Sequence, residues 1–489
     1  MKLEDWNQKV WPFPVEKKIT QECIDLFNFP ACALDEVGGR KIAEFILNLI
    51  ATEDEVFILC GAGKKGQIGK IIARRIKSAG VSLVVIDCAK EFSLNSCEYA
   101  NRIIIDAMLD GDFLDHRSNN LLIEINKFLH NAKRVIAIDV PSGINYNDFS
   151  LPKNYIKADF TVTFGGKKPC HVLSPARDAC GEVVVFDVGF DKRAVEKVLS
   201  AQRFTISFTL PKKISKSNPW AKLSASAHKF DRGHVLVIGG SSGKLGAPIL
   251  TSTAALKSGA GWASVALPCS ELKLEKFPID LTFEPFFSNE KLHIDNIKLF
   301  VETRKVTAIV IGPGTVNSPL NEEAIRYLES LSFKNILIII DAAATHGILE
   351  VNNLRANPEF FILTPHPGEW LHLSQKKPLE LPTYENLVFI FERLQRLGIS
   401  VIYKSATPLI FSGVQDLLIC QGGTNSLARA GSGDVFAGCL ASFGIFQEMT
   451  MREKCTRASA VIADALSRAS HIYGPNSILA TDLISCIQV

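Results

Sequence analysis

The chain has 489 residues, of which 47% are hydrophobic and 21% are charged, and its formal net charge is +3. This length predicts two or three domains, and the nearly balanced charge excludes the basic surface typical of nucleic-acid-binding proteins. No apolar run reaches the roughly 18 residues that span a bilayer, and twelve cysteines without metal-ligand spacing favour buried thiols in a reducing cytosol. The start of the chain lacks a signal-peptide core, so we expect a cytoplasmic protein without nucleic-acid or membrane partners.

Strand-like runs alternate with helical patterns over the first 200 residues. After a helical region at Ile19–Leu49, helices are predicted at Gly69–Ser78 and Leu121–His130, and strands at Glu55–Cys60, Val81–Asp87, Arg102–Asp106, Arg134–Asp139, Phe160–Phe164 and Glu182–Val188. Continuous Val and Ile runs separated by helices indicate a parallel sheet that is covered on both faces. The polar segment 203–233 is then expected to be a connector.

A second alternating series follows this connector. Strands are predicted at His234–Ile238, Trp262–Leu267, Thr307–Ile311, Asn335–Asp341, Glu359–Leu363 and Ser400–Lys404, with a hairpin at Leu409–Phe411 and Asp416–Cys420. Helical patterns cover Ala247–Ser258, the segment from Gly433, and Arg452–Ala469. Both halves of the chain are therefore predicted to belong to the α/β class.

Several loops that follow predicted strands are rich in glycine. Gly239–Gly243 leads toward a helix, and Gly312–Gly314 follows the strand at Thr307–Ile311. Such loops let backbone N–H groups approach a phosphate. A plain turn explains either loop equally well when it is taken alone.

Two further segments carry side chains with chemical potential. In Thr364–Glu369 two prolines stiffen a loop at the end of a strand and are expected to hold His366 and Glu369 outward. In Ala430–Gly438 a small-residue loop opens an apolar helix, and Asp434 lies in its first turn. The helix N-terminus favours an anion and the carboxylate is placed to act as a base; a surface histidine and a capped turn are the plain alternatives.

In this order, the segments resemble the ADP/ATP-dependent NAD(P)H-hydrate dehydratase family of the ribokinase-like superfamily. The resemblance covers about 225–485 and rests on the stretches HKFDRGHVLVIGGSSGKLGAPILTSTAALKSGAG, IGPG, LTPHPGE and AGSGDVFAG. It implies repair of hydrated NADH and NADPH (NADHX and NADPHX), with ADP or ATP as phosphoryl donor and Mg²⁺ on its phosphates. The domain would comprise residues 206–489 and have a ribokinase-like α/β fold.

The resemblance also implies roles for individual residues. Asp434 would be the catalytic base, and the hydrate would contact Ala247, Gly314, His366 and Asp434. The adenine nucleotide would be held by Lys404, Ser405, Ala406, Thr407, Pro408, Gly431, Ser432 and Gly433. Two positions depart from the family pattern, because Ala343 replaces an aspartate and Ser405 replaces a glycine.

Residues 1–205 resemble the Rossmann-like three-layer NAD(P)H-hydrate epimerase domain that is often fused in front of this dehydratase. The matches include VIAIDVPSG at 135–143, Lys168-Pro169 and Gly181–Gly189. Asp139 would be the catalytic and substrate-contacting acid/base, or in the plain alternative a carboxylate that caps a strand. Asp106 and Ser142 would belong to a potassium site.

Two loops of the first half depart from that family. Gly61–Gly69 reads GAGKKGQIG, so that Lys65 replaces an asparagine that would bind potassium, and Asp110 and Asp112 are new in the loop after Asp106. Either Lys65 places its ammonium where the ion would lie, or an unused loop has drifted to solvated lysines. The new carboxylates would repel a pyrophosphate-bearing ligand. We therefore expect weakened epimerase activity or a structural role.

Two rival interpretations remain open at this stage. A ribokinase-like kinase of a small vitamin-precursor alcohol would share the GSGD segment and its base, but it does not predict LTPHPGE or the fused first domain. The first half could instead be a nucleotide-sensing or assembly module without activity. Sheet enzymes of this kind often associate through helical faces, so a homo-oligomer is expected.

Overall fold

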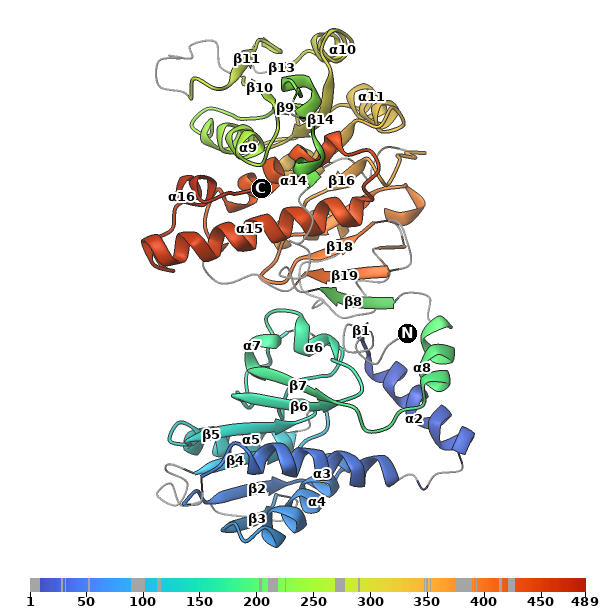
Figure 1. The fold of residues 1–489 in the computed structure, drawn as a ribbon, viewed down its shortest axis with the longest axis vertical. Coiled ribbons are helices and arrows are strands. Elements are labelled where there is room, and N and C mark those ends of the chain that lie inside the picture. Colours follow the sequence, from blue (N-terminus) through green and yellow to red (C-terminus); the bar gives the residue numbers. More distant parts are fainter. Residues whose placement is uncertain are drawn as a thin grey trace. The chain divides into compact units, whose positions relative to one another are not determined.

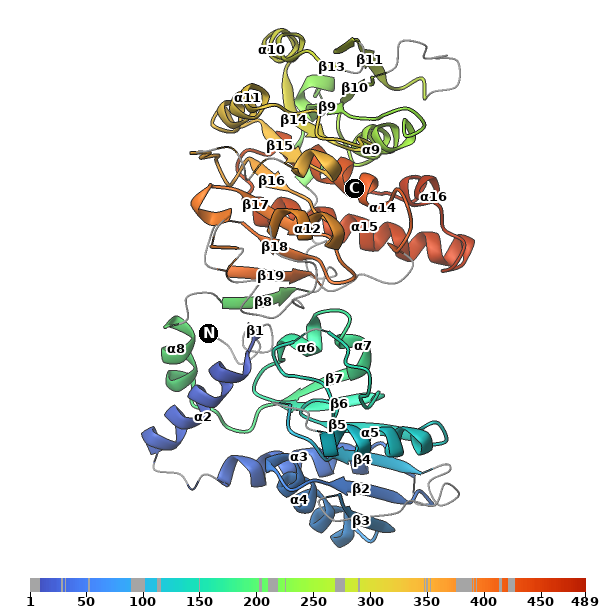
Figure 2. The same cartoon turned by 180° about the vertical axis from the view of Figure 1, so that it is seen from behind.

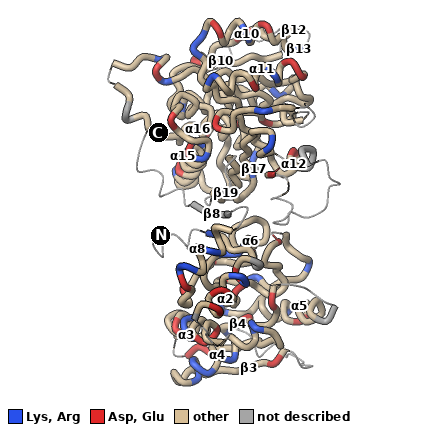
Figure 3. The backbone as a smooth tube through the Cα atoms, turned by 90° about the vertical axis from the view of Figure 1, so that its right-hand side faces the viewer, with Lys and Arg blue, Asp and Glu red and all other residues tan. Residues whose placement is uncertain are grey.

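The computed structural model shows two compact units that divide between Ser207 and Phe208. It describes residues 9–27, 30, 32–51, 53–88, 102–111, 116–148, 150–201, 205–209, 219–224, 226–268, 278–288, 291–346, 348, 351, 353–374, 389, 391–392, 394–412, 416–420 and 427–489. Within these ranges no helix is long and apolar enough to cross a membrane. Basic and acidic residues are interspersed along the tube of each unit (Figure 3), in keeping with the small net charge.

The first unit is built on a six-stranded sheet whose strands all run parallel (Figure 1). In spatial order the strands are β3 (Leu83–Asp87), β2 (Val56–Cys60), β4 (Ile103–Ala107), β5 (Arg134–Ile138), β6 (Phe160–Phe164) and β7 (Glu182–Phe186). The helices are α2 (Phe13–Phe27), α3 (Ala33–Leu47), α4 (Lys64–Ser78), α5 (His116–Leu129), α6 (Pro169–Val172), α7 (Arg177–Cys180) and α8 (Lys192–Ser200). The short strands β1 (Lys9–Val10) and β8 (Thr205–Thr209) pair antiparallel.

Both faces of this sheet are buried, as the continuous Val and Ile runs predict. Alternate residues of β2 enter two different cores: Val56 and Ile58 pack in the cluster that includes residues of α3 and α4, whereas Phe57 packs in the cluster that includes residues of α5. Successive side chains of a strand point to opposite faces, so a strand covered on both sides must be apolar throughout. The predicted three-layer α/β arrangement is confirmed.

The helical region predicted at 19–49 is confirmed and consists of two helices, α2 and α3. Two expectations for the first unit are corrected by the structure. The connector at 203–233 includes strand β8. Helix α4 begins at Lys64, five residues before the predicted start, with extended Gly63 as its N-cap residue. The glycines at 61–69 led to the prediction of a loop, but the residues from Lys64 onward are helical. Lys65 therefore lies in the first turn of α4 and not in a loop. The connector residues 211–218 lie outside the described part.

The second unit contains a larger mixed sheet. Its strands lie in the order β19 (Asp416–Cys420), β18 (Leu409–Phe411), β17 (Ser400–Tyr403), β16 (Phe361–Leu363), β15 (Leu337–Ile340), β14 (Val306–Ile311), β9 (His234–Ile238), β10 (Trp262–Ala266) and β11 (Thr282–Glu284). The strands from β17 to β11 run parallel, and β17, β18 and β19 are successively antiparallel. The predicted hairpin is thus confirmed.

Helices cover both faces of this second sheet (Figures 1 and 2). One layer holds α9 (Gly246–Lys257), α14 (Ser432–Ser442), α15 (Met451–Tyr473) and α16 (Ala480–Ser485), and the other holds α10 (Ile294–Thr303), α11 (Glu322–Ser332) and α12 (Pro367–Ser374). The patterns considered above predict neither α10 nor α11. The sequence does contain a signal for the start of α11, because asparagine is a preferred N-cap residue. In the structure, the side chain of Asn321 accepts a hydrogen bond from the N–H of Ala324 as the N-cap of this helix. The short strands β12 (Phe287–Ser288) and β13 (Lys291–Leu292) form a separate antiparallel pair.

Each sheet reverses its winding direction once, and the glycine-rich loops lie at these reversals. In the first unit the chain leaves β2 for β3 on one side and returns to β4 on the other. In the second unit it leaves β9 for β10 and returns to β14. Ligands of open α/β sheets bind where neighbouring strands diverge in this way, outside their carboxyl ends. The topology therefore points to one candidate site in each unit.

Candidate functional site

The site of the second unit is formed by residues that directly follow five parallel strands. Gly239 follows β9, Gly312 follows β14, Asp341 follows β15, Thr364 follows β16 and Lys404 follows β17. Carboxyl ends of parallel strands meet at one edge of a sheet, so these positions gather there although they span about a third of the chain. The predicted motifs are brought together by the fold.

Two of the predicted substrate residues are immediate neighbours. Gly314 has φ +74°, and a Cβ at this position would lie 3.2 Å from the Cβ of Ala247 and 2.4 Å from the carbonyl oxygen of Lys244. The Ser241 hydroxyl donates a hydrogen bond of 2.8 Å to the carbonyl of Gly314. The loops after β9 and β14 are thus held together, and only glycine fits between them.

The GSGD segment forms the N-terminus of α14. Gly431 is its N-cap residue in the left-handed region, at φ +90°. The hydroxyl of Ser432 donates hydrogen bonds to the carbonyls of Leu427 (2.8 Å) and Arg429 (2.9 Å), which fixes the entry to the helix. First-turn N–H groups of a helix have no partner within the helix, so this end can bind an anion.

A buried charge pair lies next to this helix end. The ammonium of Lys404 contacts Oδ1 of Asp341, which also accepts a hydrogen bond of 2.7 Å from the hydroxyl of Thr364. The side chain of Asp341 is 2% exposed. A Cβ at Gly433 would lie 3.4 Å from the Lys404 ammonium, so the positive charge is close to the start of α14.

Asp434 is half-buried in the first turn of α14, and its proton affinity is unusual. Loss of hydration, followed by the negative charges of Asp341 and Glu369, raises the pKa of Asp434 to about 7, against the opposing effect of Lys404. A carboxyl group with a pKa near neutrality can accept a proton and release it again. This is the property that the predicted base requires.

Replacing Asp434 by asparagine is expected to change stability in a pH-dependent way. Folding raises the pKa of this carboxyl from 3.8 to about 7, so the folded state binds the proton more tightly and loses stability as pH rises between these values. Asp434→Asn removes that penalty, and we expect a higher melting temperature than wild type at pH 8 and a much smaller difference at pH 5. Thermal unfolding at both pH values measures this, and an equal difference at the two would contradict it.

His366 and Glu369 form a closed pair, and the expectation that both point outward is wrong for Glu369. The Glu369 carboxylate is buried, lies 3.1 Å from Nε2 of His366 and accepts the His366 backbone N–H at 2.9 Å. Nδ1 of His366 accepts the N–H of Gly368 at 2.9 Å. The histidine, which is 55% exposed, therefore carries its proton on Nε2 toward Glu369.

The other predicted nucleotide residues form the turn between β17 and β18. Ser405, which replaces the family glycine, donates its hydroxyl to the carbonyl of Thr407 at 2.6 Å and accepts the N–H of Thr407 at 3.2 Å. Ala406 is exposed, and the carbonyl of Pro408 accepts the N–H of Cys420. The serine thus closes the turn on itself. Lys404, which opens this segment, lies near the GSG helix end, since a Cβ at Gly433 would be 3.4 Å from its ammonium.

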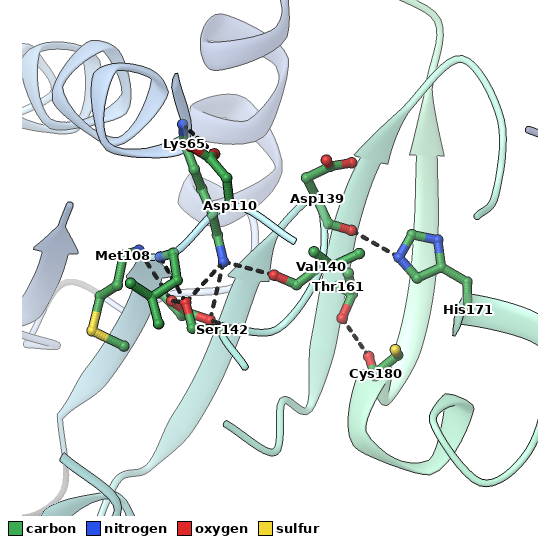
Figure 4. Close-up of polar contacts among 11 residues, drawn as sticks. Lys65, Met108, Asp110, Asp139, Val140, Ser142, Thr161, His171 and Cys180 are labelled. Carbon is green, nitrogen blue, oxygen red and sulfur yellow. Dashed lines mark hydrogen bonds and ion pairs between the residues drawn. The ribbon is translucent and has the colours of Figure 1, made fainter. Parts of the chain in front are cut away.

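In the first unit, Asp106 and Ser142 come together around the ammonium of Lys65; Figure 4 shows Lys65 with Ser142 and Val140. Nζ of Lys65 lies 3.2 Å from Oδ2 of Asp106, 2.6 Å from the carbonyl of Val140 and 3.2 Å from Oγ of Ser142. The side chain of Lys65 is 2% exposed. The alternative of a solvated lysine is therefore wrong for Lys65, whereas Lys64 is 59% exposed.

Asp110, one of the two new carboxylates, caps helix α4. Its Oδ1 accepts the N–H of Lys65 at 3.0 Å, and its Oδ2 lies 2.0 Å from the position of a Cβ at Gly63 (Figure 4). A carboxylate of the protein thus takes the place that an anionic ligand would have at this helix end. Asp112 lies outside the described residues.

Asp139 belongs to a second buried cluster, around the ammonium of Lys168. This ammonium lies 2.7 Å from Oδ1 of Asp139, 3.0 Å from Oε2 of Glu16 and 2.5 Å from the hydroxyl of Thr163. Although burial opposes ionisation, Lys168 and Thr163 together hold the pKa of Asp139 below its usual range, and burial raises that of Glu16. Asp139 also has φ +63°, which a non-glycine residue rarely adopts. Its carbonyl lies 2.8 Å from Nε2 of His171.

Sequence reasoning missed several of these partners. Lys168 was part of the matched Lys-Pro pair but had no assigned role, and neither Glu16 nor Thr364 was singled out. The signal for Thr364 was its position directly after a strand, at the same edge as Asp341. Glu16 lies in a helix of another layer, and no local pattern connects it with Lys168.

Comparison with known proteins agrees with this arrangement. The NAD(P)H-hydrate dehydratase family profile matches residues 235–489, and the profile of the YjeF-related protein N-terminus matches residues 85–170. The bifunctional NAD(P)H-hydrate repair enzymes Nnr of Escherichia coli and Coxiella burnetii are 26% and 27% identical over 457 and 484 residues. These alignments cover 88% and 92% of this chain and 84% and 93% of the two relatives. A ribokinase-like superfamily protein from Enterococcus faecalis gives a TM-score of 0.45 at 23% identity, over 57% of this chain and 93% of that one.

Proposed function

The chain belongs to the NAD(P)H-hydrate dehydratase family, and from this premise we propose that its second unit restores NADH and NADPH from their hydrates, using a nucleotide phosphoryl group. The observation that carries this proposal is Asp434, a carboxyl group with a pKa of about 7 in the first turn of α14, beside the ammonium of Lys404. A base and a positive charge thus flank a helix end that suits a phosphate.

In the proposed reaction, Asp434 takes the proton of the hydrate's hydroxyl group. The oxygen then forms a bond to the terminal phosphorus, and the bond from that phosphorus to the nucleotide breaks. Loss of the resulting phosphate, together with a proton from the adjacent ring carbon, restores the dihydronicotinamide. The N–H groups of Gly433 and its neighbours would stabilise the charge on the phosphoryl group.

The hydrate would lie between the loops that hold Ala247 and Gly314, on one side, and His366 on the other. Because Gly314 packs closely against Ala247 and has no side chain, the hydrate would contact the backbone on this side of the site. The Nε2–H of His366 is engaged with Glu369. The ring is therefore oriented by the protein before a ligand arrives, which favours a positioning contact over proton transfer.

ADP or ATP would bind at the GSG helix end, with Lys404 and the turn 405–408 around it. Lys404 would exchange its contact with Asp341 for a phosphate oxygen, since its ammonium already lies near Gly433. In the described part of the chain, no group of three His, Cys, Asp or Glu side chains could hold a metal ion. Mg²⁺ would thus be held mainly by the nucleotide phosphates, where it neutralises charge.

For the first unit we propose hydrate epimerisation at Asp139, weakened by the changed loops. Asp139 and Lys168 place two ionisable groups together after β5, which supports the site. The lowered pKa of Asp139 makes it a weak base, and Asp110 at the start of α4 opposes binding of a pyrophosphate there. Following the interconversion of the two hydrate epimers on the full chain tests this. We also predict that the protein forms a homo-oligomer and that it is located in the cytoplasm. Light scattering of the purified protein measures its oligomeric state.

The decisive assay mixes the full chain with NADPHX, MgCl₂ and either ADP or ATP. Nucleotide-dependent recovery of dihydronicotinamide absorbance is expected. Recovery without nucleotide, or none with either nucleotide, would contradict the proposal. A stable phosphorylated product from a vitamin-precursor alcohol would instead favour the kinase alternative.

A further inference from the structure

The site around Lys65 in the first unit has an unusual composition for an internal salt bridge. The side chain of Lys65 is 2% exposed, and its ammonium contacts the carboxylate of Asp106, the backbone carbonyl of Val140 and the hydroxyl of Ser142. Three different kinds of oxygen converge on one positive centre: one from Asp106 within strand β4, and two from the loop that follows the adjacent strand β5. Carboxylate and backbone carbonyl oxygens are also the ligands that hard metal cations take in proteins.

Asp106 and Ser142, which supply two of these oxygens, are also hydrogen-bonded to each other. Ser142 donates its hydroxyl to Oδ1 of Asp106 at 2.5 Å and its N–H to Oδ2 at 2.7 Å, and Met108 donates its N–H to Oδ1 at 3.2 Å (Figure 4). The carboxylate is thus fully engaged and deeply buried, at 1% exposure. A buried carboxylate needs a compensating positive charge. In the described structure Lys65 supplies it.

The position of Lys65 excludes a second cation at this point. A potassium ion bound by Asp106, Val140 and Ser142 would have to lie where Nζ lies, and two like charges in a buried site repel strongly. The residues present therefore do not fit a potassium site, although Asp106 and Ser142 are in place for one. The prediction of bound potassium through these two residues is not supported by this geometry.

The cluster also bears on Asp139, which precedes Val140. The Asp139 backbone is held at φ +63° by its N–H, which donates to Val162, by the His171 contact at its carbonyl, and by the Lys65 contact one residue later. A strained backbone persists only where its surroundings over-determine it. Lys65 is one of the groups that do so, from a different element, α4.

We propose that the ammonium of Lys65 is a tethered replacement for a bound monovalent cation, so that this unit holds Asp139 in place without added potassium. Lys65 is in this sense a positioning residue, and it does not touch the proposed substrate. The inference concerns the first unit alone and does not rest on the proposed dehydration. It predicts a cation requirement that appears only when the tether is removed.

The test compares wild type with Lys65→Asn in the full chain, by thermal unfolding at constant ionic strength in choline, sodium or potassium chloride. The wild-type melting temperature should be the same in potassium and choline. Lys65→Asn should melt about 6 °C or more lower in choline, the usual scale for leaving a buried charge unpaired. Potassium should restore much of this loss, because the shorter side chain leaves room for the ion.

Two matched variants complete the experiment. Lys65→Met keeps the bulk without the charge and should stay low in all three salts, and Lys64→Asn, at the exposed neighbour, should match wild type. Epimer interconversion should follow the same pattern and be rescued by potassium only in Lys65→Asn. Potassium-specific stabilisation of wild type, a Lys65→Asn variant as stable as wild type in choline, or one that potassium does not rescue would each overturn the proposal.

Discussion

Replacing Asp434 by asparagine is expected to lower the rate of nucleotide-dependent hydrate dehydration by about 10²-fold or more, the usual scale for losing a positioned acid or base. Asparagine keeps the size and polarity of the side chain but cannot accept the proton of a hydroxyl group. Asp434 is half-buried in the first turn of α14. Because a base acts in the chemical step, the loss should fall on kcat more than on KM. The initial rate with saturating NADPHX and nucleotide measures it.

The matched control is Asp295→Asn. Asp295 also lies in the first turn of a helix of the same unit, α10, but its side chain is 88% exposed and forms an ion pair with Lys298. This variant should keep the wild-type rate. A fully active Asp434→Asn enzyme would reject the assignment of the base, whatever the effect on its stability.

The pH dependence of wild type follows from the same carboxyl group. With a pKa of about 7, Asp434 is mostly protonated at pH 6 and mostly ionised at pH 8. Because only the ionised form is a base, activity should rise about tenfold between these values. Asp434→Asn should lose this rise and, as argued above, gain stability at pH 8. One raised pKa thus links the catalytic role to a cost in stability.

The second site could be predicted from the sequence because its chemistry follows the ends of strands. Runs of Val and Ile marked the strands, and the residues at their C-terminal ends lie at the common edge. Gly312 follows its predicted strand, whereas Asp341 and Lys404, predicted as the last residues of strands, directly follow β15 and β17. The fold places such residues together without any further information. The positions of strand ends did not predict the side-chain contacts at this edge. Glu369 points inward and contacts His366, and Asp341 forms an ion pair with Lys404.

The first site was harder to predict because its partners come from distant layers. The sequence left open whether the Lys65 ammonium reaches Asp106 and Ser142 or is solvated. The early start of α4, which the glycine-rich pattern did not predict, directs the side chain to these two residues. Glu16 lies on α2, and its pairing with Lys168 depends on how that helix packs. Local patterns report periodicity and caps, but a contact between elements far apart in sequence depends on tertiary packing.

Lys168→Met is expected to cause the largest loss of stability among the substitutions considered. The Lys168 ammonium is fully buried and lies between the carboxylates of Asp139 and Glu16, at 2.7 and 3.0 Å. Removing it leaves two negative charges without a counter-charge, on the half-buried side chains of Asp139 and Glu16. Breaking a buried ion pair in this way costs about 3–5 kcal/mol, whereas Lys192→Met, at an exposed pair with Glu196, should cost less than about 1 kcal/mol. Denaturant unfolding of the full chain measures both values.

Glu16→Gln separates charge from packing in this cluster. Burial already raises the pKa of Glu16, so this carboxylate is the partner whose charge costs more to keep. The double variant Lys168→Met/Glu16→Gln should therefore recover part of the loss, since one negative charge is gone and Asp139 retains the hydrogen bond with Thr163 at 2.7 Å. If the double variant were as unstable as Lys168→Met, the loss would come from packing of the methylene chain, and the electrostatic account of this cluster would be wrong. A recovered double variant would show that Lys168 stabilises the unit by separating two carboxylates that the fold brings together around the strained backbone of Asp139.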